Sequence, residues 1–449
     1  MINSDLQTAV IHLTAKKRRY DMLWRYYDGD QPLVYSSEKL REIFSGLDAR
    51  FTENWCAVVA DSVLDRMELR TPAVSDNEDV SAQLTDMWEQ TGLVDDELSI
   101  HEDVIVTGES FVIAWPDEQT GIPQAFHNDA RICHVEYDGE NPRQMRYAAK
   151  WWTDGDGMVR LTLYYPDRLE YYVSKRAYKT GEEPDARAFQ PWGDEPVAVN
   201  PYGQIPVFHF RSNRRKVKSQ LAGVVEIQDM VNKMLADMMV AAEFGAFPQR
   251  YVISAAGIKG LENNPNAIWD LVASDQGSQA TQAGQFAAAS LDNYLGAINK
   301  LSADIGVISR TPRHYFYTQG GDPSGEALIA MEAPLTKKVS RLQATLLPTW
   351  RDLAAFLLTI DNVPIDSQDI LVDYEEVATV QPRTQAEIRK LAVDAGMPLR
   401  GYLRDYEGYT AADLDEFDAD MQGQRVAQRT YADAVLTAAQ TDFDRGEAV

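Results

Sequence analysis

The sequence predicts an α+β protein that is mainly helical, and three patterns lead to this prediction. Apolar residues recur at helical spacing near both ends of the chain, whereas residues 110–173 alternate with a period of two, as strands do. Two helical stretches of similar length bracket a mixed segment, and a very long helical pattern follows them. With 449 residues and 45% apolar content, the chain is long enough for several domains and a substantial core.

The chain is acidic, with a formal net charge of −26, which argues against tight, sequence-specific binding of a DNA duplex. Between Thr71 and Ala130 there are 14 acidic residues and no Lys or Arg, which indicates a solvated outer surface. The two cysteines, Cys56 and Cys133, lack metal-ligand spacing, so we expect a reducing compartment without a disulfide framework. No apolar run approaches 18 residues, so we expect no membrane span.

The first third of the chain reads as helices followed by antiparallel strands. A basic run at 16–19 lies inside the first helix; a solvated face or contacts with neighbouring acids are favoured over a phosphate contact. The segment Asp154-Gly155-Asp156-Gly157 resembles part of a calcium loop but lacks the downstream Glu, so a hairpin turn is favoured. Helices are expected over 5–27, 53–68, 79–91 and 94–106, and strands over 111–115, 132–135, 146–152, 159–165 and 169–173.

A metal site near the middle of these strands is a minor alternative. His127 and His134 lie close in sequence to Asp129 and Glu136, residue types that bind transition metals. The spacing matches no established metal motif, so the sequence favours a protein without a metal or another cofactor.

The central part of the chain predicts two helices around a small module. Residues 176–204 read as an irregular connection, 207–210 as a short strand, and 219–243 and 287–309 as helices with broad apolar faces. A strand over 250–254 belongs to the segment between the two helices. The simplest geometry is an antiparallel helix pair that carries this module. In the first helix, Asp229 and Lys233 are expected to form an i,i+4 pair on the polar side.

The long helical pattern follows the sequence Asp322-Pro323. Asp322 can accept hydrogen bonds from the first N–H groups, and Pro323 suits the first helical position. A helix over 323–360 would be roughly 55 Å long, with kinks expected at Pro334 and Pro348. Its apolar positions are Leu328, Leu335, Val339, Leu342, Leu346, Trp350, Leu353 and Leu357. After this helix, we expect a strand over 370–372 and helices over 384–394, 398–406 and 411–439.

The order of these parts resembles the portal proteins of tailed bacteriophages, of the siphophage type, over nearly the whole chain. The two most specific motifs are Phe247-Pro248-Gln249-Arg250 and Asp322-Pro323-Ser324-Gly325-Glu326-Ala327-Leu328. Other matches are Tyr27-Asp28-Gly29 before Pro32, Asn54-Trp55 with Val59, Asp61 and Arg66, Thr107-Gly108-Glu109-Ser110-Phe111-Val112, Leu163-Tyr164-Tyr165-Pro166-Asp167, Ile205-Pro206-Val207 and Ser219-x-Leu221.

The resemblance implies the portal fold, with an α/β wing, a two-helix stem, a small α/β clip, a long kinked helix and a helical crown. It divides the chain into a wing (1–218), first stem helix (219–244), clip (245–286), second stem helix (287–309), tunnel loop (310–322), long helix with the return strand of the wing (323–381) and crown (382–449).

The resemblance also implies a function without catalysis. Portal proteins form a ring, twelve-fold in the virion, that conducts double-stranded DNA without sequence specificity at one capsid vertex. The implied partners are further copies of this chain, the terminase large subunit, a head–tail adaptor, and the major capsid and scaffolding proteins, with no membrane. Assembly would take place in the host cytoplasm.

Three groups of residues are the candidate sites that follow from this resemblance. The tunnel loop would contact DNA in the channel through Arg310, Arg313, His314, Tyr315, Tyr317 and Gln319. Subunit contacts are expected at Arg214, Arg215, Lys216, Lys337, Lys338 and Arg341, and docking of terminase or adaptor at Arg250, Lys259, Asn263, Asn264 and Trp269. In an alternative interpretation of the loop, its tyrosines pack between neighbouring loops and its arginines pair with acids of the adjacent long helix.

Two other functions remain as alternatives. A metal-dependent nuclease would need a carboxylate cluster, for which Glu226, Asp229 and Asp237 are the best candidates. A solvated helix face explains these acids better, and the chain lacks the motifs of common hydrolases and nucleotide-binding enzymes. A minor capsid or adaptor protein would not be expected to have the observed order of helix, insert, helix, loop and long helix.

Overall fold

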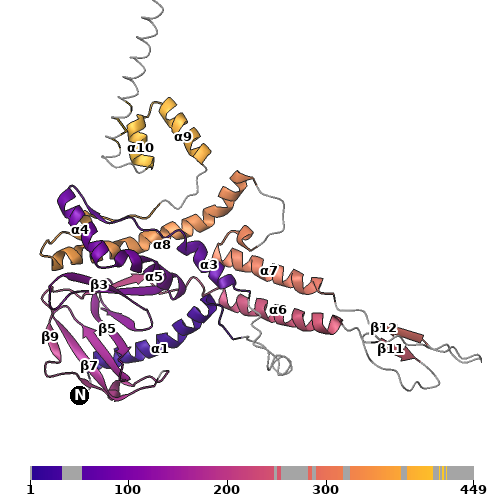
Figure 1. Cartoon of the computed structure of the whole chain (residues 1–449), viewed down its shortest axis with the longest axis horizontal. Coiled ribbons are helices and arrows are strands. Elements are labelled where there is room, and N and C mark those ends of the chain that lie inside the picture. Colours follow the sequence, from indigo (N-terminus) through magenta and orange to yellow (C-terminus); the bar gives the residue numbers. More distant parts are fainter. Residues whose placement is uncertain are drawn as a thin grey trace, which may run out of the picture. The chain divides into compact units, whose positions relative to one another are not determined.

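The computed structural model describes residues 3–32, 53–179, 181–246, 250–253, 282–285, 290–316, 324–375 and 382–407, with four further positions at 414, 417, 418 and 421. The chain divides into two compact units, Met1–Val377 and Ala378–Val449. The described part of the first unit combines a six-stranded and a three-stranded antiparallel sheet, two two-stranded sheets and several helices, and the long helix α8 packs against the three-stranded sheet (Figure 1).

Four helices among the described residues before 110 confirm the predicted helical pattern. Asparagine side chains at Asn3, Asn54 and Asn77 each accept a hydrogen bond from a backbone N–H of the first turn, which fixes the start of three of these helices. The helices are α1 (Ser4–Tyr27), α3 (Trp55–Leu64), α4 (Glu78–Gln90) and α5 (Leu93–Val106).

The larger sheet is antiparallel, with strands in the order β4-β5-β6-β7-β8 and with β9 paired to β7. The predicted hairpin turn at 154–157 joins β5 to β6, where Gly157 adopts a positive φ of 78°. Its strands are β4 (Cys133–Tyr137), β5 (Met145–Thr153), β6 (Met158–Tyr164), β7 (Arg168–Ala177), β8 (Phe189–Pro191) and β9 (Val197–Val199).

The smaller sheet has the order β10-β2-β3, and α5 and α8 pack against it. Its strands are β2 (Glu109–Pro116), β3 (Pro123–Asn128) and β10 (Val207–Arg211). Gly108, directly before β2, has a positive φ of 101°, and an added Cβ would lie 2.8 Å from the backbone of Lys218. The glycine therefore allows the chain leading to α6 to cross this point.

The prediction for residues 176–204 as irregular connection was wrong in part, because β8 and β9 lie there and extend the larger sheet. Strand β3 was also missed. Both errors concern short segments with Pro or polar residues, which form strands because neighbouring strands offer backbone partners.

Two helices of the central region, α6 (Val225–Ala246) and α7 (Asp292–Ser309), contact each other and extend away from the sheets as an antiparallel pair (Figure 1). Between them in the chain, β11 (Arg250–Ile253) pairs with β12 (Gln282–Gln285). The predicted starts at 219 and 287 were too early. Before α6, Ser219 accepts a hydrogen bond from the N–H of Leu221, and residues 220–224 form turns.

Helix α8 (Gly325–Ile360) has 36 residues and continues through Pro334 and Pro348. Its N-cap is Ser324, which accepts from the N–H of Ala327, so the predicted start at Pro323 with Asp322 as cap was wrong. The predicted apolar stripe is confirmed for its buried members, Leu335, Val339, Leu342, Leu346, Trp350, Leu353 and Leu357.

Helix α8 supplies the centre of the main hydrophobic core. Trp350 is fully buried, lies 4.5 Å from Phe210 of β10 between ring centroids, and donates to the hydroxyl of Tyr374. The predicted strand near 370 is confirmed as β13 (Ile370–Leu371), which pairs with β1 (Ala73–Val74). A separate core joins the first half of α1 to β5 and β6.

The second unit contains α9 (Pro382–Asp394) and α10 (Leu399–Glu407), which contact each other. They confirm the helices predicted at 384–394 and 398–406. The helix predicted over 411–439 falls almost wholly outside the described residues. In the part of the chain that the structure describes, no helix combines the length and apolar character needed to cross a membrane.

Candidate functional site

The loop between α7 and α8 begins with a tight turn at the end of α7. Arg310 adopts a positive φ of 60°, and the N–H of Thr311 donates to the carbonyl of Gly306 over 3.0 Å. The hydroxyl of Ser309 donates to the carbonyl of Ile305 and lies 2.9 Å from the hydroxyl of Thr311. These bonds satisfy backbone groups that a helix end leaves open, so the direction of the loop is fixed from its first residues.

Phe316 fixes the loop against the body of the protein. Its ring is buried and lies 5.1 Å from the ring of Trp55 in α3, measured between centroids. A Cβ added to Gly306 would lie 3.1 Å from the same ring and 3.2 Å from the carbonyl of Thr311. The absence of a side chain at Gly306 therefore permits the close approach of the loop to α7.

A polar network ties His314 and Tyr315 to other elements. Glu332 of α8 accepts from Arg66 on one oxygen, at 3.1 Å, and lies 3.1 Å from Nε2 of His314 on the other. The same guanidinium donates to the hydroxyl of Tyr315 over 2.8 Å. All of these side chains are partly buried, so the network joins the segment directly after α3, the loop and the first part of α8.

Lys338 connects α8 to the end of α7. Its Nζ donates to the carbonyl of Ser309 over 2.9 Å, where the negative end of the helix dipole favours a cation. Burial, together with the charges of Arg310 and Lys218, lowers the pKa of Lys338 to about 8. Three basic groups therefore lie near the turn that starts the loop.

The predicted DNA contacts of the loop fall into three sets. Arg310 and Arg313 are exposed. His314 and Tyr315 are half-buried and bonded within the subunit. Tyr317 and Gln319 lie outside the described residues.

The predicted subunit contacts are mostly exposed cations. The exposed members are Arg214, Arg215 and Lys216 after β10, and Lys337 and Arg341 on α8. Lys338 differs, because it is partly buried and donates to the carbonyl of Ser309. Arg214 and Arg215 also line a cavity of about 1010 Å³ together with Arg143 and Arg211, and Asp352 is the one acidic residue in its lining. Such a cationic surface can accept carboxylates of another chain.

Of the predicted docking residues, Arg250 is the first residue of β11, which pairs with β12. Lys259, Asn263, Asn264 and Trp269 lie outside the described residues. Their role stays a prediction.

The carboxylates weighed as a nuclease site have other partners. Asp229 is buried and accepts from the hydroxyl of Tyr26 over 2.7 Å, and burial raises the pKa of its carboxyl. Asp237 pairs with Lys233, so the predicted Asp229–Lys233 pair was wrong. Glu226 is exposed. Because Asp229 is buried, the interpretation of these acids as one solvated helix face was also wrong.

The four residues weighed as a metal site in the strands do not come together. His127 lies 2.9 Å from Asp103, and Asp129 pairs with Arg131, whereas His134 lies beside Glu136 and His12 of α1. His12 was missed because it is more than a hundred residues away in the chain. The contacts of Arg66 with Tyr315 and of Trp55 with Phe316 were missed for the same reason, whereas the contacts of Gly306 with Phe316 and of Glu332 with His314 are closer in the chain but follow no local pattern.

Comparisons with known proteins agree with the resemblance seen in the sequence. The family model described as "Phage portal protein, SPP1 Gp6-like" matches residues 9–400. The portal protein of Mycobacterium phage D29 is 25% identical over 389 residues, which is 79% of this chain and 76% of that protein. The portal protein of Mycobacterium phage L5 is 24% identical over 339 residues, 68% of this chain and 65% of that protein.

Solved structures show weaker similarity. A chain from the virion of a native gene transfer agent particle aligns with a TM-score of 0.45 at 11% identity, covering 82% of this chain and 91% of that chain. A chain from the neck of an empty gene transfer agent particle aligns with a TM-score of 0.44 at 10% identity, covering 81% and 90%.

Proposed function

This chain belongs to the phage portal protein family, and on that premise we propose that about twelve copies form the ring through which double-stranded DNA passes at one capsid vertex. Portal proteins are structural components of the virion and assemble as homo-oligomeric rings. The observation that carries the proposal is the family match over residues 9–400, which spans the six-stranded and three-stranded sheets, the helix pair and the long helix.

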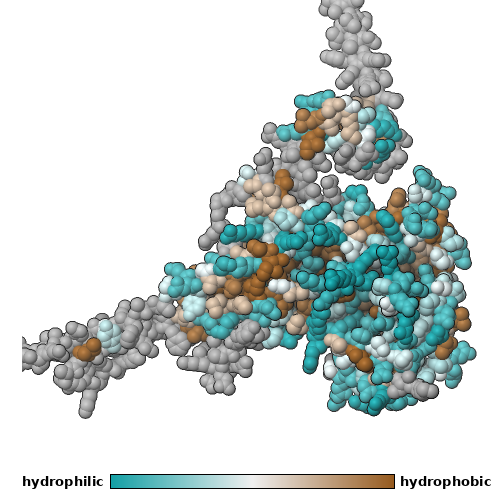
Figure 2. Space-filling view, turned by 180° about the vertical axis from the view of Figure 1, so that it is seen from behind, coloured by the Kyte–Doolittle hydropathy of each residue, from teal (hydrophilic) through white to brown (hydrophobic). Residues whose placement is uncertain are grey.

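The surface of the helix pair supports assembly with further copies. Large apolar side chains are exposed along it, and Figure 2 shows apolar surface gathered over this region on the face displayed. Soluble monomers rarely expose such groups together, and a neighbouring subunit would cover them. The exposed apolar side chains are Met230 and Met239 of α6 and Leu295, Val307 and Ile308 of α7.

The parts of the portal fold can be assigned to the observed elements. We assign the six-stranded and three-stranded sheets with α1, α3, α4 and α5 to the wing, α6 and α7 to the stem, and the segment that carries β11 and β12 to the clip. Helix α8 and β13 complete the wing, and α9 and α10 begin the crown. The loop between α7 and α8 is the tunnel loop.

We propose that the tunnel loop faces the channel and that Arg310 and Arg313 meet the DNA backbone. Both side chains are exposed, while the base of the loop is held by the Arg66–Glu332 network and by Phe316. Contacts between cations and phosphates do not read sequence, and few contacts in each subunit keep binding weak enough for a moving duplex.

We propose that the clip docks the terminase large subunit during packaging and the adaptor afterwards. Because α6 and α7 contact each other directly, they can stay paired when the segment between them is shortened. Replacing residues 247–289 with a short flexible linker should therefore leave the ring intact and abolish terminase binding in a pull-down assay. Terminase binding at the level of the unchanged protein would refute the assignment of the clip.

Electron microscopy of the purified protein tests the proposed ring. Negative-stain images should show rings with a central hole, and native mass spectrometry should give about twelve times the chain mass of 50.4 kDa. Each chain carries a net charge of −26, so added salt, which screens repulsion, should favour assembly. A monomer or dimer at every salt concentration would contradict the proposal.

A further inference from the structure

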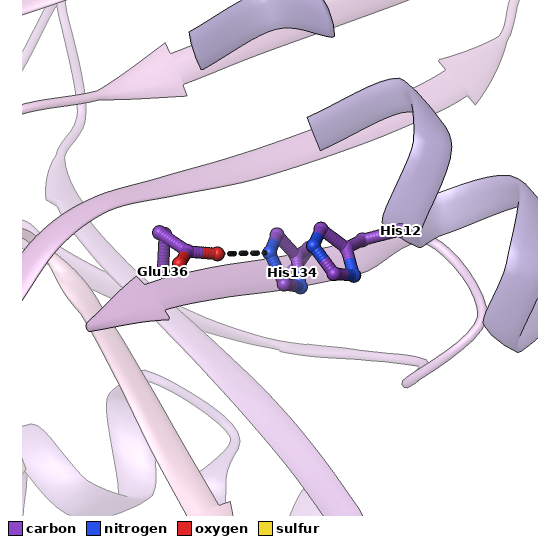
Figure 3. A group of neighbouring side chains, drawn as sticks. All are labelled: His12, His134 and Glu136. Atoms are coloured by element: carbon purple, nitrogen blue, oxygen red, sulfur yellow. Dashed lines mark hydrogen bonds and ion pairs between the residues drawn. The ribbon is translucent and has the colours of Figure 1, made fainter. Parts of the chain in front are cut away.

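Two histidines from distant parts of the chain meet where α1 packs against β4. The rings of His12 and His134 lie face to face, with centroids 4.6 Å apart and planes inclined by 14°. Glu136 is two residues after His134 on the same strand, so both side chains leave the same face of the sheet. Figure 3 shows its carboxylate directed at the His134 ring, at a distance of 3.2 Å from Nε2.

These three side chains have the composition of a metal site. One possible ligand atom from each lies within 4.8 Å of the other two. No other group of three His, Cys, Asp or Glu side chains is placed in this way within the described part of the chain. The other four histidines have different partners: His101 contacts Tyr374, His127 contacts Asp103, His209 contacts Glu109, and His314 contacts Glu332.

The surroundings of the cluster hold His134 in place and balance the nearest cation. His134 lies on β4, with Nε2 at 3.2 Å from Glu136 on one side and its ring stacked on His12 on the other. Lys16 lies one helical turn after His12 on α1, and its ammonium is compensated by Glu109 at 2.9 Å.

We propose that His12, His134 and Glu136 bind one divalent transition-metal ion, for which zinc is the best fit. Two imidazole nitrogens and one carboxylate oxygen form a common zinc ligand set, which leaves the fourth position to water. The site goes beyond the proposed ring and does not depend on it.

Binding requires one local rearrangement. The lone pairs of imidazole lie in the ring plane, so two nearly parallel stacked rings do not point at a common ion. His12 is exposed on the surface of α1 and can change rotamer without disturbing the core, whereas His134 is held in the strand. The ion would then join α1 to β4, elements more than a hundred residues apart, and stabilise their packing.

Metal titration of the full chain, without a histidine tag and stripped with EDTA, tests the site. Zinc chloride is added in a calorimeter and cobalt chloride is followed by visible absorption, with excess magnesium present to occupy surface carboxylates. We expect one zinc ion per chain, a tetrahedral cobalt spectrum, and a rise of about 2–4 °C in the midpoint of thermal unfolding at saturating zinc.

Variants separate this site from other metal binding. His12→Ala keeps the helix, because alanine is the best helix former, and should weaken zinc binding at least about tenfold. Glu136→Gln should weaken it as well, whereas His127→Gln, which changes a histidine with a carboxylate partner elsewhere, should leave it unchanged. The proposal would be overturned if His12→Ala bound zinc with the same affinity, and gave the same cobalt spectrum, as the unchanged chain. It would also be overturned if the unchanged chain did not bind one zinc ion per chain.

Discussion

The guanidinium of Arg66 lies 3.1 Å from the carboxylate of Glu332, although the two residues are 266 positions apart in the chain. Arg66 follows α3 and Glu332 lies in the first part of α8, so this pair joins the N-terminal helices to the long helix. Because Glu332 also contacts His314 and Arg66 also contacts Tyr315, the same pair holds the base of the loop between α7 and α8. The stability of the loop base is therefore linked to the segment directly after α3.

Removing Arg66 should loosen the loop base. In Arg66→Ala, Glu332 and Tyr315 each lose a charge-assisted hydrogen bond in a partly buried setting, which should cost about 1–3 kcal/mol of unfolding free energy. Chemical unfolding and hydrogen exchange of residues 310–316 measure this effect. Arg70→Ala, which breaks the exposed pair with Glu375, is the control and should cost less than about 1 kcal/mol. Equal effects of both variants would contradict this role of Arg66.

Two glycines of α7 should respond in opposite directions to alanine. Gly306→Ala places a methyl group against the Phe316 ring and the Thr311 carbonyl, so it should displace the loop and destabilise the protein. Gly296→Ala meets no atom within 4 Å and should stabilise α7 by about 0.5–1 kcal/mol. Thermal unfolding of the two variants distinguishes them. A stabilising effect of Gly306→Ala would show that the loop does not pack closely here.

Lys338 should add a pH dependence to the stability of the chain. Its folded pKa of about 8 lies below the value of about 10.4 for a free lysine, so the unfolded chain binds more protons between these values. The unfolding free energy should therefore rise with pH from about 8 to 10. In Lys338→Met this contribution is absent and the rise should be smaller. Urea unfolding at four pH values measures this rise, and Lys337→Met, which changes an exposed lysine, is the control. If the unfolding free energy changes with pH equally in all three proteins, the charge of Lys338 is not buried.

The exposed cations of the loop should affect DNA without affecting assembly. The double variant Arg310→Ala with Arg313→Ala should still form rings, but it should retain packaged DNA less well and with a weaker dependence on salt. His314→Ala should instead lower stability, because it removes a partner of Glu332. DNA retention is measured by nuclease protection of filled particles. If the double variant retains DNA as well as the unchanged protein, the arginines do not contact the duplex.

The long helix was the most predictable part of the fold. Its apolar positions from Leu335 to Leu357 form one stripe at helical spacing, and a stripe of this length is typical of an amphipathic helix packed on a core. The helix start was less predictable, because Asp322 and Ser324 are both good capping residues and only the fold selects Ser324. Strand β12, with the sequence Gln282–Gln285, has no strand propensity of its own and forms by pairing with β11.

The candidate site was predictable as a location but not in its contacts. The loop between two helical patterns is visible in the sequence, whereas the partners of His314 and Tyr315 come from positions that no local pattern links to them. The same holds for Asp229, which reads as part of a polar face but is buried under Tyr26 of α1. Pairings across more than two hundred residues depend on the folded chain, and a single sequence does not encode them as a visible pattern.

The central claim is that this chain forms a closed ring whose tunnel loops face the central hole. A single-particle reconstruction of the assembled protein at a resolution that traces helices tests it most directly. The predicted result is a closed ring of about twelve subunits with the turn at Arg310 and the start of α8 lining the hole. A ring with these loops on its outer surface, or particles without a closed ring, would contradict the account.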